Sequence, residues 1–92
     1  MRLSKKAIKS FVSRIKYLDG GDTVVFGFVD GFGDRARLIV TRTLTGRYRV
    51  DYRGPGRWDE PDYFNTIDAV VDNLHRNGVD EVLLVDIVSE GR

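Results

Sequence analysis

The fold of this chain is decided by residues 23–53, TVVFGFVDGFGDRARLIVTRTLTGRYRVDYR. Short runs rich in β-branched and aromatic residues predict three consecutive strands, at 23–29, 35–44 and 47–53. The residues between the first two strands, from Asp30 to Asp34, include two glycines, which favours a hairpin loop. The stretch is therefore predicted to form a three-stranded antiparallel meander.

The turn between the second and third strands fixes which side chains share a face of this meander. If Leu44, Thr45 and Gly46 form the turn, with Gly46 in the left-handed conformation, Thr43 pairs with Arg47. A two-residue turn would shift the register by one and mix charged with apolar residues on both faces, which burial penalises. We therefore predict one apolar face directed toward the helices. The opposite face would carry Arg37, Ile39, Thr41, Thr43, Arg47, Arg49, Asp51 and Arg53.

Two amphipathic helices and a fourth strand complete the prediction. Apolar residues recur at helical spacing over residues 4–18 and again from Ile67 to Leu74. The second helix is predicted to start from an N-cap at Asn65 and to end at Gly78. The fourth strand, at 81–88, is apolar on both faces, so we place it inside the sheet or against another chain.

The order helix, three strands, helix, strand predicts one small α+β domain over residues 1–92. We expect a two-layer sandwich with a mainly antiparallel four-stranded sheet, strand order 4-1-2-3, and both helices on one face. A right-handed crossover would place the fourth strand beside the first and parallel to it. The face that carries the arginines would then be open.

This order of elements resembles that of double-stranded RNA-binding domains. That family's second helix opens with a basic, lysine-containing motif, whereas the matching region of this chain is Asn65-Thr66-Ile67-Asp68, so RNA binding is not carried over. In order and size the chain also resembles some phage-encoded anti-CRISPR inhibitors. That resemblance lies in topology, without a shared motif.

Charge is divided unevenly along the chain, although the net charge is only +1. Residues 1–57 carry a balance of +8 and residues 58–92 a balance of −7. Such asymmetry indicates either an acidic partner for the basic half or attraction between the halves within the fold. The chain has no cysteine, which fits a reducing cytoplasm, and no apolar run approaches the roughly 20 residues that span a bilayer. We expect a cytoplasmic protein.

The residues that catalysis requires are nearly absent from the sequence. His75, the only histidine, falls on the last turn of the second helix, and the serines have no base at a suggestive spacing. Asp59, Glu60 and Asp62 lack the pattern of a calcium loop and fit a solvated acidic loop better. We predict that the chain is not an enzyme and carries no cofactor or metal.

The sequence therefore predicts a non-enzymatic protein-interaction module, such as a small inhibitor or accessory protein of a phage or mobile element. Arginines and exposed aromatic residues are the side chains that interface hot spots favour. A protein partner is expected, and an open sheet edge would also allow a homodimer. The predicted partner-binding residues are Arg37, Arg47, Arg49, Arg53, Phe32, Trp58 and Tyr63.

The alternative is nucleic-acid binding through the arginine and threonine face together with the N-terminal lysine helix. Alternate residues of a strand lie roughly 6.6–7 Å apart, a spacing at which arginines can contact phosphates. Asp51 in the middle of the face counts against this alternative, as do Tyr48 and Tyr52, which the predicted register turns inward. The residues of this alternative are Lys5, Lys6, Lys9, Arg37, Thr41, Thr43, Arg47, Arg49 and Arg53.

Overall fold

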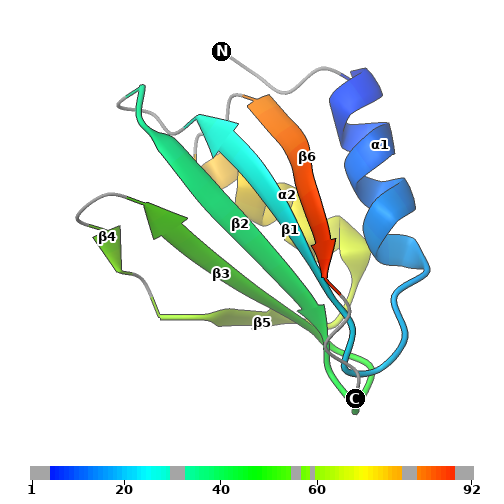
Figure 1. Ribbon diagram of the computed structural model, residues 1–92. Helices are drawn as coiled ribbons and strands as arrows, with labels where there is room; N and C mark the ends of the chain where they lie inside the picture. The colour runs from blue at the N-terminus through cyan, green and yellow to red at the C-terminus, as the bar shows by residue number, and fades with distance from the viewer. Residues whose placement is uncertain (1–4, 30–32, 55–56, 59, 78–80, 89–92) are drawn as a thin grey trace.

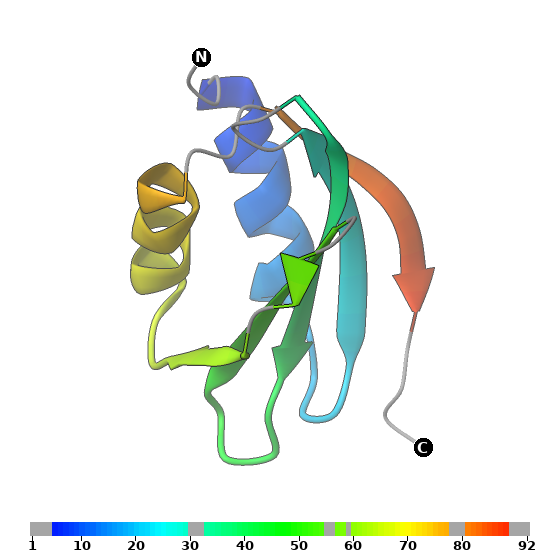
Figure 2. The ribbon, with the colours of Figure 1, turned by 90° about the vertical axis from the view of Figure 1, so that its left-hand side faces the viewer.

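A computed structural model describes residues 5–29, 33–54, 57–58, 60–77 and 81–88. The two helices lie on the same side of an antiparallel sheet, which Figure 2 shows from the side. The predicted α+β class and two-layer arrangement are thus confirmed. In chain order the elements are α1 (Lys5–Lys16), β1 (Thr23–Val29), β2 (Arg35–Arg42), β3 (Tyr48–Gly54), β4 (Arg57–Trp58), β5 (Asp62–Phe64), α2 (Ile67–Arg76) and β6 (Glu81–Val88).

The sheet follows the order β4-β3-β2-β1-β6, and β5 pairs with β3 as well (Figure 1). The four long strands therefore have the predicted order 4-1-2-3. The sheet is larger than predicted because the segment expected to be a loop supplies two short strands, β4 and β5. The last strand, β6, lies at an edge of the sheet and not inside it.

The prediction that the last strand runs parallel to the first is wrong, because β6 pairs with β1 in the antiparallel direction. The cause lies in β5, where Tyr63 stands opposite Arg49 and the chain runs back along β3. This return brings the chain to the other end of the sheet before α2 starts. The helix then crosses in the opposite sense to the one expected, and β6 has to come back antiparallel to β1.

The predicted turn between the second and third strands is confirmed. The Thr43 amide donates to the Arg47 carbonyl at 2.8 Å, and Gly46 is left-handed with φ 86°. Beyond this turn, Leu38 stands opposite Tyr52 and Val40 opposite Val50. All four of these side chains are buried, so this face of the meander packs toward the helices as expected.

The core lies between this sheet face and the two helices. In α1 the ring of Phe11 packs against Phe26 of β1, with 4.7 Å between ring centroids. The Tyr52 hydroxyl donates to Asn73 Oδ1 of α2 at 2.7 Å, which satisfies a polar group at the rim of the core. Among the residues whose burial the structure describes, the buried hydrophobic ones are Phe11, Ile15, Val24, Phe26, Phe28, Ala36, Leu38, Val40, Tyr48, Val50, Tyr52, Val70 and Leu74.

The second helix starts one residue later than predicted. Thr66, and not Asn65, is the N-cap, because its hydroxyl accepts a hydrogen bond from the Ala69 amide at 3.2 Å. Asp68 consequently lies in the first turn, where the helix dipole favours an acidic side chain. The predicted stop at Gly78 lies outside the described residues.

Candidate functional site

The face of the sheet turned away from both helices is the candidate site, and we call it the open face (Figures 1 and 2). Strand pairing arranges its side chains in rows that run across β1, β2 and β3. The first row joins Gly27, Arg37 and Arg53; the middle row joins Val25, Ile39 and Asp51; the third row joins Thr23, Thr41 and Arg49. The pairing of β6 with β1 continues the middle row to Asp86, which stands opposite Val25.

The structure brings five of the predicted partner-binding residues together on the open face. Arg37, Arg47 and Arg53 are exposed, and the Arg49 side chain retains 42% of its accessible surface. Tyr63, 46% exposed, joins them because β5 pairs with β3. The guanidinium carbon of Arg47 lies 5.1 Å from the centroid of the Tyr63 ring, a cation–π contact that holds both side chains in place.

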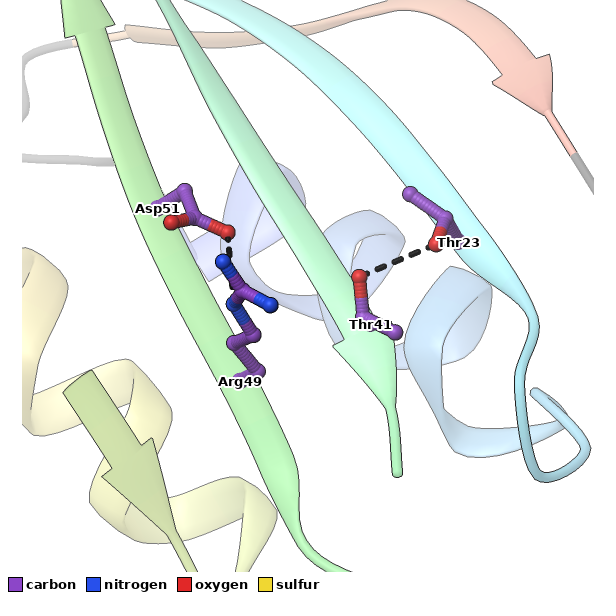
Figure 3. Close-up of polar contacts among 4 residues, drawn as sticks. All are labelled: Thr23, Thr41, Arg49 and Asp51. Atoms are coloured by element: carbon purple, nitrogen blue, oxygen red, sulfur yellow. Dashed lines mark hydrogen bonds and ion pairs between the residues drawn. The ribbon is translucent and has the colours of Figure 1, made fainter. Parts of the chain in front are cut away.

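Asp51 is the acidic exception on this face, and it is buried, with 6% of its surface exposed. A buried carboxylate is costly without a counter-charge. Arg49 supplies one from the same strand, with its Nε 3.2 Å from Asp51 Oδ2 (Figure 3). This Nε meets the distance of an ion pair but not the geometry of a hydrogen bond, so the contact is mainly electrostatic. Both residues belong to the basic half, so this pair does not join the two halves of the chain.

The two threonines predicted to contact phosphates already have partners within the chain. The Thr41 hydroxyl hydrogen-bonds to the Thr23 hydroxyl at 2.9 Å, as Figure 3 shows. The Thr43 hydroxyl contacts Thr45 Oγ1 at 3.0 Å and accepts from the Arg47 amide at 2.9 Å. Their hydroxyl groups therefore stabilise the sheet and its turn.

The remaining predicted residues are placed differently in the described part of the chain. Lys5, Lys6 and Lys9 are exposed on α1, which belongs to the layer on the other side of the sheet. Phe32 lies outside the described residues. For Trp58, in β4, the structure describes the backbone but not the side chain. That backbone pairs with Arg53 of β3, so its register position continues the first row of the open face.

Among the described residues, sequence reasoning missed two exposed apolar side chains and a third that is partly exposed. Leu44 in the β2–β3 turn is 88% exposed, and Tyr17, just after α1, is 76% exposed. The turn and the end of α1 lie at the same end of the molecule (Figure 1). Val25 is partly exposed in the middle row of the open face. A leucine inside a predicted turn was the one available signal.

Within the described residues, no three histidine, aspartate or glutamate side chains gather in a way that could hold a metal ion. Neither described helix has the length and apolar character needed to cross a membrane. Comparison with protein-family models finds no matching family, and comparisons with curated proteins and with solved structures find no match either.

Proposed function

We propose that this chain is a non-enzymatic protein-interaction module that binds an acidic partner through the open face. One observation carries the proposal: on β1, β2, β3 and the β2–β3 turn, the described residues of this face include five arginines and a single aspartate, and no helix covers them. An acidic position, Asp86, stands beside them on the edge strand β6, opposite Val25. The arginines are Arg35, Arg37, Arg47, Arg49 and Arg53.

The arrangement of these arginines supports binding more than a purely solubilising role. Arg37 and Arg53 stand directly opposite each other on neighbouring strands, which places two positive charges at one end of the open face. A carboxylate of an acidic partner would meet the exposed side chain of Arg37 at this end. Arg47 is already held against the Tyr63 ring, so less side-chain entropy is lost when it binds.

A matched pair of charge variants tests the proposal. Arg37→Gln with Arg47→Gln removes two positive charges from the open face, whereas Lys5→Gln with Lys9→Gln removes two from α1 in the other layer. Each tagged protein is used to capture partners from a nuclease-treated lysate, and the captured proteins are quantified by mass spectrometry. The proposal expects a protein that the arginine variant loses and the lysine variant keeps. Equal retention or equal loss by the two variants would contradict it.

Nucleic-acid binding is the second candidate, favoured by arginines at strand spacing on an uncovered face. Three features count against it: the bonded hydroxyls of Thr41 and Thr43, the position of the lysines on α1, and the carboxylate of Asp51. Binding to duplex and single-stranded oligonucleotides should be measured in a salt titration that starts at about 50 mM, where phosphate contacts are strong. Tight binding that weakens steeply with salt would establish this alternative, and no binding at the lowest salt would exclude it.

A further inference from the structure

The middle row of the open face differs in chemistry from the rows on either side. Its residues on β1 and β2, Val25 and Ile39, are apolar and partly exposed, and they stand opposite each other. Arg37 precedes Ile39 by two residues on β2, and Arg53 stands opposite Arg37. On the other side, Arg49 stands opposite Thr41. Along β2, an apolar centre, defined as Val25 and Ile39, therefore lies between two cationic ends. Across the row, the register places Asp51 of β3 and Asp86 of β6 on either side of this centre.

The spacing of these groups matches that of an extended polypeptide. Along β2, residues 37, 39 and 41 follow each other on one face at roughly 6.6–7 Å. A partner in the extended conformation presents its alternate side chains at the same interval. A carboxylate, an apolar side chain and a second carboxylate at alternate positions would therefore meet Arg37, Ile39 and Arg49 in turn.

We propose that the open face binds an acidic, extended protein segment in which an apolar residue lies between two carboxylates, in the pattern Glu-Xaa-Val-Xaa-Glu. This inference rests on the proposed function and names the chemistry of the partner. The apolar residue covers the apolar centre, which is otherwise wetted. The two carboxylates pair with Arg37 at one end and with Arg49 at the other.

The same geometry disfavours a polyphosphate. A nucleic-acid strand carries a charge at every nucleotide, so a phosphate would fall on the middle row whenever its neighbours reached the two cationic ends. There it would meet Val25 and Ile39, which offer no hydrogen bonds, beside the carboxylate of Asp51. A protein segment can leave this position neutral, and a phosphodiester backbone cannot.

Two peptides of identical composition test the inference on the unaltered protein. The first, Ser-Glu-Ser-Val-Ser-Glu-Ser, places the valine between the glutamates, and the second, Ser-Glu-Glu-Ser-Ser-Val-Ser, does not. Binding is followed by the shifts of backbone amide resonances in isotope-labelled protein at about 50 mM salt, where charge pairing is only partly screened. Because burial of the valine side chain contributes to binding, we expect the first peptide to bind about tenfold more tightly. The shifts should centre on Arg37, Ile39 and Thr41.

Three outcomes overturn the inference. The first is equal binding of the two peptides, and the second is a set of shifts centred on α1. The third is a single-stranded oligonucleotide of similar charge that binds more tightly than either peptide. If the peptides bind equally while the captured partner is still lost with Arg37→Gln and Arg47→Gln, the inference fails and the proposed function stands. If the arginine variant changes neither peptide binding nor capture, both fail.

Discussion

Replacing Gly46 by alanine tests the turn that decides which sheet face carries the arginines. Gly46 is left-handed, with φ 86°, and a Cβ atom added there would meet only Arg42 Nη2, at 3.8 Å. Because there is space for a methyl group, the cost of the substitution comes from the backbone conformation alone. The prediction therefore isolates the effect of the left-handed residue.

The magnitude follows from two opposing effects. A left-handed conformation costs an L-residue other than glycine about 1–2 kcal/mol. Alanine also restricts the unfolded chain, which returns about 0.4–1 kcal/mol of stability. We expect Gly46→Ala to lower the free energy of unfolding by about 1 kcal/mol, which lowers the Tm of a chain of this size by about 4–8 °C.

Gly20→Ala is the matched control, because Gly20 does not have a positive φ and its added Cβ would make ordinary contacts with Leu44 at 3.4 Å. That substitution should leave stability unchanged or raise it slightly. Both variants are measured by urea unfolding followed by circular dichroism. If Gly46→Ala is as stable as the unaltered protein, or if Gly20→Ala loses as much, the left-handed turn and the register built on it are refuted.

Three further substitutions test the packing, the helix cap and the buried charge by the same unfolding measurement. Leu74→Ala empties a fully buried position and should lower the free energy of unfolding by about 2–5 kcal/mol. Leu44→Ala, at an 88% exposed leucine, should change it by no more than about 0.5 kcal/mol. Similar losses for both variants would contradict the described core. Thr66→Ala should lower the free energy of unfolding by about 1 kcal/mol, and Asn65→Ala should lower it much less. A larger loss for Asn65→Ala than for Thr66→Ala would assign the N-cap to Asn65. Arg49→Met leaves the buried carboxylate of β3 without its cation and should cost about 1–2 kcal/mol, less than a fully buried pair because the arginine is 42% exposed. No loss would mean that this ion pair does not stabilise the sheet.

Local patterns in the sequence predicted most of the individual elements. The bounds of β1 and β6 agree with the predicted strands, and the stripe of apolar residues in α2 faces the core as expected. Most of the candidate site followed from the same reasoning. Once Gly46 fixed the register, the two-residue period of β3 placed Arg47, Arg49 and Arg53 on one face.

Other features of the site could not be predicted, because they depend on contacts between distant residues. Tyr63 became part of the open face only through the pairing of β5 with β3, in a segment whose prolines and acidic residues indicate a loop. Asp51 was placed on this face but not recognised as buried, because its burial depends on what surrounds it in the folded sheet. The exposure of Val25 depends on the absence of a covering layer over the described sheet, and no local pattern records that.

The sequence by itself thus determined the periods of the strands and helices, the turn at Gly46 and the division of side chains between two faces of the meander. These depend on backbone preferences and on the alternation of neighbouring residues. Only the tertiary structure decided the direction of β6 and the addition of Tyr63 to the open face. The physical reason is that the return of residues 62–64 along β3 is a pairing between segments, and this pairing sets the end of the sheet at which α2 begins. A pattern within either segment alone does not encode it.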